Sequence, residues 1–313
     1  MTPLLLVNYH YVRPRDAHPH PGIHPISAEE LDAQVAALKA DLHAATPQEV
    51  EAWAAGDDRL PGPAFFLTFD DGLIDHHEAV PAVLAKHGVR AAFFVNSRPL
   101  SEGRAITVHK VHWLRAETAP AAFRAAFLDL LPAEGRALVE QHDAARAAAE
   151  TNRYDPPEIA RLKYAINFLL PYEQVDAASA AMLRARGLSE SDFCEMFYMT
   201  AGQISGLRDA GHVIGSHAHS HRPLSRLDHA DADVVANLDC LERISGRRPD
   251  WLSYPWGSPW SIPDDAEALC RRHGFRLAIT LNRDWNRGGE PAHLLNRVNT
   301  NEVDAMLRQR PAA

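Results

Sequence analysis

The stretch LTFDDGLIDH, residues 67–76, determines how this chain is interpreted, because an apolar run ends there in two adjacent carboxylates and a glycine. Asp70 and Asp71 lie at the predicted end of a strand, and Gly72 allows the backbone to turn sharply after them. Two carboxylates this close resist joint ionisation, so the pKa of one should rise unless a cation offsets their repulsion. The pair therefore indicates a bound cation, for which a metal ion is the simplest candidate.

Short apolar runs alternate with longer helical patterns along the chain, and this alternation is typical of a parallel sheet or barrel. Most of the runs are almost continuously apolar, as strands buried on both faces should be. The predicted strands are residues 4–10, 64–70, 91–96, 212–216, 251–254, 277–281 and 294–298. The sequence thus predicts an α/β fold.

The segment from about residue 113 to 199 interrupts this alternation, because it is long, rich in alanine and contains no convincing strand. We interpret it as a helical insertion between the third and fourth strands of a single domain that spans residues 1–313. Capping boxes that begin at Ser27, Thr46 and Thr200 predict three helix starts elsewhere in the chain.

Composition excludes several classes of function. The net charge of −9 offers no basic stretch for a phosphate backbone, so we expect no nucleic-acid partner. The three cysteines are few and odd in number, which favours a reducing compartment over a disulfide framework. The start of the chain has no basic leader, and its apolar run at residues 4–7 is too short to span a membrane. We therefore expect a cytoplasmic protein without a membrane span.

Ligands that complete a metal site with Asp71 are found in GHVIGSHAHSHRPLSRL, residues 211–227. His217 and His221 are four residues apart, so one helical turn would place both imidazoles on the same side. Two histidines and one aspartate make a three-ligand site with an open position, which is typical of catalytic rather than structural zinc. The pattern predicts that Asp71, His217 and His221 hold a metal ion.

Spacing alone is a weak signal in a chain with 18 histidines. His20 and His24 have the same separation, but a proline and a glycine between them exclude a helical turn. We assign His76 and His77 to the surface of a helix. The pair in residues 211–227 differs because it follows a predicted strand end, where parallel α/β folds gather their functional groups.

A third strand end carries the sequence SYPWGSPW, residues 253–260. Pro255 and Gly257 flank Trp256 in a rigid turn that could direct a backbone N–H at a developing oxyanion. The alternative interpretation is a turn that contains a buried aromatic side chain.

The motifs TFDDG, SHAHSH and YPWG, in this order, resemble the first three motifs of the polysaccharide deacetylases, carbohydrate esterase family four. The opening NYHYVRP also resembles the start of many members. The resemblance implies a distorted (β/α) barrel of about seven parallel strands. It also implies hydrolysis of an N-acetyl group from an amino sugar with a divalent metal, most simply Zn²⁺, with Co²⁺, Ni²⁺ or Mn²⁺ as alternatives.

The resemblance also implies residue roles. Asp71, His217 and His221 would be the metal ligands, and Asp70 would be the general base. The backbone N–H of Trp256 would share the oxyanion with the metal. We also place Tyr254 and Pro255 of the third motif, together with Arg297 and Trp285, among the substrate contacts.

Two departures from the family pattern leave roles open. Ser253 occupies the position at which many members have an arginine that orients the base. Arg297, in LLNRVN, could supply this cation from another direction, and a surface arginine is the alternative.

The second departure is the absence of the usual leucine-any-histidine motif near the C-terminus, which normally provides the general acid. His293 precedes its strand and is a doubtful substitute. We assign the acid to His10, at the predicted end of the first strand, and a purely structural histidine is the alternative. Asp284 and Trp285 would line a groove or form an ordinary loop pair.

We expect an intracellular amino-sugar substrate, such as a nucleotide-activated sugar or a lipid-linked precursor of a surface polysaccharide. Residues of the insertion that could contact a phosphate or sugar are Arg153, Tyr154, Lys163 and Tyr164. One alternative is a deformylase or another non-sugar amide hydrolase with the same metal site. Another is an inactive barrel that only binds carbohydrate, although such a protein would not need Asp70 as a base. The sequence does not determine the oligomeric state.

Overall fold

The computed structural model describes residues 1–141, 143 and 157–311. The chain divides into two compact units. The first comprises residues 1–14, 25–104 and 194–313, and the second comprises residues 15–24 and 105–193. The first unit contains the strands, and the named elements of the second are helices. The assignment of the whole chain to one domain stays a prediction.

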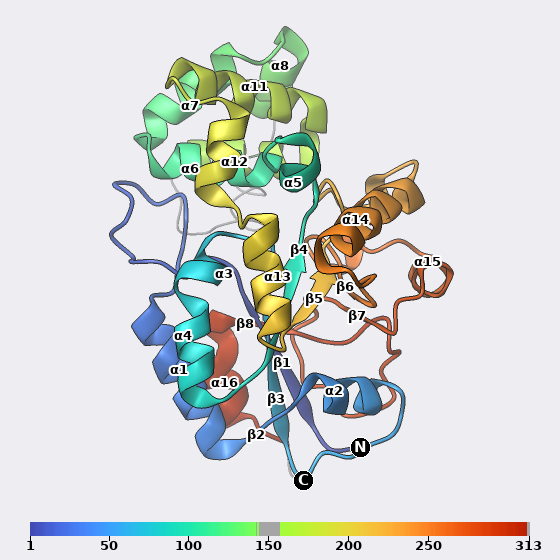
Figure 1. Cartoon of the computed structure of the whole chain (residues 1–313). Coiled ribbons are helices and arrows are strands. Elements are labelled where there is room, and N and C mark those ends of the chain that lie inside the picture. The colour runs from blue at the N-terminus through green and yellow to red at the C-terminus, as the bar shows by residue number, and fades with distance from the viewer. Residues whose placement is uncertain (142, 144–156, 312–313) are drawn as a thin grey trace. The chain divides into compact units, whose positions relative to one another are not determined.

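The first unit contains a curled sheet whose named strands are all parallel (Figure 1). The strands are β1 (Leu4–Tyr9), β2 (His43–Ala44), β3 (Ala64–Phe69), β4 (Ala91–Val95), β5 (Val213–Ser216), β6 (Trp251–Ser253), β7 (Leu277–Ile279) and β8 (Val298–Asn299). Their order is β7-β6-β5-β4-β3-β1-β8, and β2 pairs with the first residues of β3. The prediction of an α/β fold with a distorted barrel is confirmed.

The last predicted strand differs from the observed one for a topological reason. Leu295 forms an isolated bridge with Ile279 of β7, whereas Val298 pairs with Val7 of β1. One short segment therefore contacts β7 first and pairs with β1 afterwards, and only its last part is assigned as β8. The short strand β2 was not predicted, because two residues carry too little pattern.

Burial on both faces explains the continuous apolar runs of the strands. Every residue of β1, β3 and β4 is buried. Alternate residues belong to different clusters: Leu4 and Leu6 pack in one, while Leu5 and Val7 pack in another that includes Leu31 of the first helix. Because side chains alternate across a strand, both clusters require apolar residues, and the sequence shows no polar alternation.

Helices surround the sheet of the first unit, and α1 packs against α4 and α16 (Figure 1). These helices are α1 (Ala28–Asp41), α2 (Pro47–Ala54), α3 (Asp75–Glu78), α4 (Val80–His87), α5 (Arg98–Glu102), α13 (Ala201–Asp209), α14 (Ala230–Ser245), α15 (Ala266–His273) and α16 (Val303–Arg308). The capping boxes predicted at Ser27, Thr46 and Thr200 are all present, and each satisfies otherwise unbonded backbone donors.

The second unit is built from α6 (Thr107–Ala116), α7 (Pro120–Asp129), α8 (Ala133–Gln141), α10 (Pro157–Tyr164), a π-helix η1 (Ala165–Leu169) and α11 (Tyr172–Ala185). Helix α12 (Glu190–Phe197) contains the boundary between the units. Lys110 is completely buried, and its ammonium lies 2.7 Å from a carboxylate oxygen of Asp176 and 3.0 Å from one of Glu190. A buried lysine requires such partners, so this cluster fixes α6 against α11.

The residues singled out in the helical segment have different outcomes. Arg153 and Tyr154 lie outside the described residues. Lys163 and Tyr164 are the last two residues of α10, and Tyr164 is buried. Their contact with a substrate stays a prediction.

No helix in the described part of the chain has the length and apolar character needed to cross a membrane. Cys194, Cys240 and Cys270 are all buried and form no disulfide. They pack as small apolar side chains.

Candidate active site and metal centre

The three motifs meet at the carboxyl ends of parallel strands. Asp70 directly follows β3, His217 follows β5, and Tyr254 follows β6. Because these strands run in the same direction in one sheet, their ends share one rim. The expected positions of the motif residues at strand ends are therefore observed.

Asp71, His217 and His221 converge closely enough to hold one metal ion, with one potential ligand atom from each lying within 4.8 Å of the others. The Nε2 atoms of His221 and His217 lie 3.3 and 3.5 Å from the same Asp71 oxygen, Oδ1. Tetrahedral zinc with bonds of about 2.0–2.1 Å places neighbouring ligand atoms roughly 3.3–3.4 Å apart. Two imidazoles and one carboxylate fit a divalent metal in both chemistry and spacing.

The loop that carries the two histidines is not the predicted helical turn. Ala218 has φ +57° and His221 has φ +58°, both in the left-handed region. Such backbone angles are not helical, and the centroids of the two imidazole rings lie 5.0 Å apart. The spacing of four correctly predicted convergence, but the prediction of helical geometry was wrong.

Backbone conformations that are costly for residues other than glycine are concentrated in the motifs. Among the described residues, the non-glycine positions with positive φ are Asp71, Ala218, His221 and Trp256. Each such conformation costs on the order of 1–3 kcal/mol and persists only where its surroundings enforce it. The surrounding structure therefore stabilises an arrangement of side chains that unconstrained loops would not adopt.

The orientation of His217 favours metal binding. Its Nδ1 lies 2.8 Å from the carbonyl oxygen of Ser253, so an N–H at Nδ1 can donate there and leave Nε2 available to a metal. Burial lowers the pKa of His217, but the neighbouring carboxylates of Asp70 and Asp71 outweigh burial, and the net shift is upward. Protons should therefore compete with metal for this imidazole at acidic pH.

Two asparagines that the sequence did not single out support the histidine loop. Asn237 of α14 is fully buried and donates to the carbonyl oxygens of Ala218 at 2.7 Å and Val95 at 2.9 Å. Asn96, immediately after β4, also donates to Ala218 at 3.2 Å and to His217. Asn96 could have been noticed as a polar residue at a strand end, but Asn237 on a helix gave no signal.

A second set of contacts holds the middle of the same loop. Asp233, one turn before Asn237 on α14, accepts from the backbone N–H of His219 at 2.7 Å and of Ser220 at 3.2 Å. The His219 ring lies between Ser97, at 2.9 Å, and Glu102 of α5, at 3.0 Å. His219 therefore orders the loop, while His217 and His221 face Asp71.

Replacing Asn237 by leucine is expected to weaken metal binding about 10- to 100-fold, the usual effect of removing support from metal ligands. The Oδ1 atom of Asn237 has no hydrogen-bond partner among the described residues, so its removal breaks no hydrogen bond. Competition with a chromophoric zinc chelator measures the effect. Asp239→Asn on the same helix is the control. Unchanged affinity in a folded Asn237→Leu protein would contradict the assignment.

Asp70 forms a buried, two-pronged ion pair with Arg297. The two guanidinium nitrogens lie 2.9 and 2.7 Å from the two carboxylate oxygens, and both side chains are nearly inaccessible, Asp70 at 2% and Arg297 at 0% exposure. The hydroxyl of Ser253 lies 3.2 Å from Asp70 and 2.9 Å from Arg297. The small side chain of Ser253 thus lies beside the pair, and the cation comes from the residue that directly precedes β8.

The burial of Arg297 distinguishes between the roles predicted for it. The surface alternative is wrong, because the side chain is buried and also donates to Thr68 and to the carbonyl of Thr280. The predicted contact of Arg297 with substrate stays a prediction. Its geometry matches the other alternative, a cation that orients Asp70.

The ion pair also sets the charge state of Asp70. Burial disfavours the ionised carboxylate, but the Arg297 guanidinium and then His217 offset this cost, so the pKa of Asp70 lies below its ordinary value. Asp70 is therefore ionised at neutral pH, as a proton acceptor must be.

His10 lies on the same rim, at the end of β1, with its Nε2 4.0 Å from Asp71 Oδ2. Burial lowers the pKa of His10, although Asp71 and Asp70 oppose that shift. A lowered pKa does not favour the protonated form, and the role of His10 as general acid stays a prediction. His293, the other option, contacts the carbonyl of Phe275 at 3.0 Å.

The backbone is left-handed in the turn at Trp256. Trp256 has φ +68°, and Gly257 follows with φ +63°. A Cβ at Gly257 would lie 2.8 Å from the backbone nitrogen of Leu281, so only glycine fits. Within the described residues, the Trp256 N–H makes no hydrogen bond, which leaves this donor available.

Three other predicted contacts are corrected by burial. Trp285 is 1% exposed and packs in the hydrophobic core, so it cannot line a groove. The Tyr254 ring is also buried, and its hydroxyl bonds the carbonyl of His293 at 3.1 Å. Pro255 is buried as well and acts through the turn geometry. His76 is not on a helix surface, because it is buried and contacts the carbonyl of His10.

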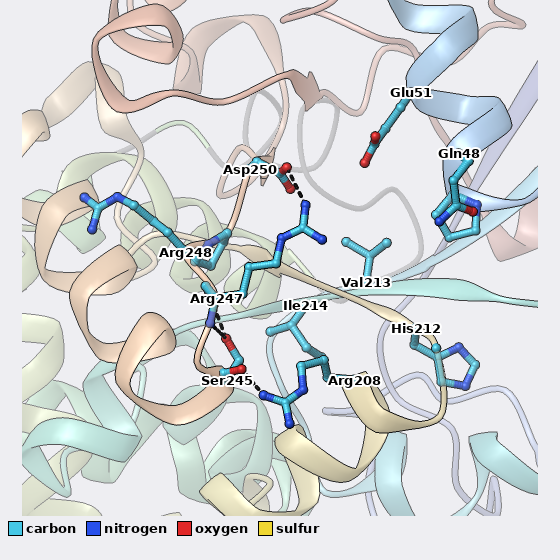
Figure 2. Close-up of a pocket in the computed structure, with 13 residues that line it drawn as sticks. Gln48, Glu51, Arg208, His212, Val213, Ile214, Ser245, Arg247, Arg248 and Asp250 are labelled. Atoms are coloured by element: carbon cyan, nitrogen blue, oxygen red, sulfur yellow. Dashed lines mark hydrogen bonds and ion pairs between the residues drawn. The ribbon is translucent and has the colours of Figure 1, made fainter.

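A cavity of about 230 Å³ lies at the opposite ends of the strands, before β5 and β6 (Figure 2). Its arginines already have partners: Arg247 pairs with Asp250 at 2.9 Å, and Arg208 bonds the carbonyl of Ser245. Parallel α/β barrels place their chemistry at the carboxyl ends of the strands, whereas this cavity lies at the amino ends. We assign this cavity no role in the reaction.

The fold and the rim residues together define a parallel α/β barrel with a three-residue candidate metal site beside a buried aspartate. The sequence profile of the polysaccharide deacetylase family matches residues 57–126 and 179–278. These ranges cover more than half of the chain and contain all three motifs. The chain belongs to the polysaccharide deacetylase family.

Individual relatives are distant. A peptidoglycan deacetylase of Helicobacter pylori is 27% identical over 81 residues, which are 25% of this chain and only 27% of that protein. The Ammonifex degensii IcaB structure has a TM-score of 0.59 at 19% identity and covers 98% of this chain and 97% of its own. The Streptococcus pyogenes deacetylase PplD has a TM-score of 0.60 at 14% identity, with 99% coverage of both chains. These structures are similar in fold.

Proposed function

We propose that this protein is a metal-dependent hydrolase that removes an N-acetyl group from an amino sugar. The observation that carries the proposal is the convergence of Asp71, His217 and His221 beside an Asp70 held ionised by Arg297. Membership of the polysaccharide deacetylase family supports the same reaction. A protein that only bound carbohydrate would not need a buried, charged base next to three potential metal ligands.

The residues divide the chemistry among them. A divalent metal held by Asp71, His217 and His221 would polarise the amide carbonyl and lower the pKa of water towards about 7. Asp70 accepts the proton of the attacking water, and Arg297 keeps its carboxylate oriented and charged. The N–H of Trp256 stabilises the oxyanion, a contribution worth about two to three orders of magnitude in rate. His10 is the proposed proton donor to the leaving amine.

Zinc is the metal that we propose, because a two-histidine, one-carboxylate set is typical of catalytic zinc sites. Cobalt, nickel or manganese could bind the same donors. The proposed substrate is an amino sugar in an intracellular precursor, linked to a nucleotide or a lipid, and a polymer is the alternative that the substrate panel tests.

Removing the metal with a chelator is expected to abolish acetate release, and adding Zn²⁺ or Co²⁺ should restore it. The measurement pairs elemental analysis with an enzymatic assay for acetate on acetylated amino sugars, monomeric and polymeric. Formylated substrates assayed for formate provide the comparison with a deformylase. Full activity in protein shown to be metal-free would refute metal dependence, and the absence of any acyl release would refute the hydrolase.

A further inference from the structure

Aromatic side chains extend from the metal site to the protein surface. The His221 ring lies 6.1 Å from Trp256, which lies 5.5 Å from Trp260 between ring centroids. The indole N–H of Trp256 donates to the carbonyl of His221 at 3.3 Å. Trp260 is 36% exposed, which is unusual for a residue of this size. The row therefore begins at a candidate metal ligand and ends at solvent.

Arg226 completes the row at its outer end. Its guanidinium carbon lies 4.8 Å from the centre of the Trp260 ring, within the range of a cation–π interaction. Arg226 ends the short helix η2 (Leu224–Arg226), and Trp260 lies in η3 (Pro259–Ser261). The hydroxyl of Ser225 donates to the carbonyl of Trp260 at 2.7 Å, so the two turns are joined directly.

The Arg226 guanidinium has no carboxylate partner in the described part of the chain, and the residue is exposed where it lies over the Trp260 ring. Other exposed arginines of the same unit, such as Arg271 and Arg276, pair with carboxylates. The chain as a whole carries a net charge of −9, so anions are repelled except where a local cation attracts them. A guanidinium fixed by stacking loses little freedom when it binds the two oxygens of a phosphate or carboxylate.

We propose that Arg226 and Trp260 form an anion-binding subsite beside the metal site and that it receives a phosphate or carboxylate group of the substrate. This inference rests on the proposed function and names its substrate class: an N-acetylated amino sugar that carries an anionic group. The Trp256 and Trp260 rings supply apolar faces for the sugar between the anion and the acetamido group.

Calorimetric titration of the full chain tests the subsite. The ligands are N-acetylglucosamine, its 1-phosphate, and a disaccharide of N-acetylglucosamine with a uronic acid. The titrations are done with metal and after chelation, because phosphate also binds metal ions. We expect at least one anionic ligand to bind about 10- to 100-fold more tightly than the neutral sugar in both forms, a ratio that falls as salt is raised. The two anionic ligands distinguish a glycosyl phosphate from an acidic saccharide.

Variants assign the preference to these residues. Arg226→Gln should lose it, and Arg226→Lys should retain part, because an ammonium keeps the charge but not the planar fork. Trp260→Leu should weaken it by removing the stacking surface. Arg271→Gln, at an exposed and paired arginine on α15, is the matched control and should behave like the unmodified protein. Thermal unfolding of each variant verifies folding.

Equal affinity for neutral and anionic sugars in the unmodified protein would overturn the subsite, as would a preference that survives Arg226→Gln. An Arg226-dependent preference without acetate release from any substrate would support the subsite and refute the deacetylase. Acetate release without a preference for anionic sugars would support the deacetylase and refute the subsite. The two proposals can therefore fail separately.

Discussion

Asp70→Asn is expected to lower kcat by about 10²–10⁴-fold while leaving metal binding intact. The asparagine has nearly the same shape but cannot accept a proton, and general-base catalysis typically contributes this factor. Asp70 is not one of the three converging ligand residues, so the metal content should remain at that of the unmodified protein. The measurement is the rate of acetate release at saturating substrate, with metal quantified in the same sample.

His217→Ala is the comparison for this variant. It removes a ligand atom 3.5 Å from Asp71 Oδ1, so both metal and turnover should be lost together. Substantial turnover in Asp70→Asn would remove Asp70 from its role as base. Loss of metal in Asp70→Asn would show instead that this carboxylate helps to hold the ion.

Arg297→Leu is expected to destabilise the protein by about 3–5 kcal/mol, because it leaves the buried Asp70 carboxylate without its cation. Activity should also fall, since the carboxylate loses its orientation and its ionised form is disfavoured. Urea-induced unfolding of the metal-free protein measures the stability, and acetate release measures the activity.

The double variant Asp70→Asn/Arg297→Leu tests whether the cost comes from the uncompensated charge. Removing both charges should recover much of the free energy of unfolding without recovering activity, and a double-mutant cycle gives the coupling. If the double variant loses as much free energy of unfolding as the sum of the two single losses, the ion pair is not the origin of the destabilisation.

Stability as a function of pH provides a further check on this pair. The pKa of Asp70 is lower in the folded chain than its ordinary value, so its stabilising contribution is present above the unfolded pKa of about 3.9 and is lost as pH falls through the folded pKa. Without Arg297, burial should raise the folded pKa, and the cost then grows as pH rises. The difference in stability between the two proteins should therefore be larger at pH 7 than near pH 4.

Much of the candidate site could be predicted from sequence because it depends on strand ends. The run that ends at Asp70 and the run that ends at Ser216 are buried strands, and parallel strands present their carboxyl ends on one rim. The convergence of Asp71 with two distant histidines follows from this topology. The same reasoning failed for the loop that carries His217 and His221, which was expected to form a helical turn. Positive φ values at Ala218 and His221 give this loop a different backbone, and that backbone brings the two rings together.

Local sequence patterns were enough to identify the chemical groups and to place them at the ends of buried strands, since apolar continuity and turn residues are local properties. The pairing of Asp70 with Arg297, 227 residues away, and the burial of Trp285 in the core became visible in the folded chain alone. Charge pairing and burial depend on distances in space, which a linear pattern does not contain. The same reason hid Asn237, whose amide supports the loop of His217 and His221 from a helix with no motif of its own.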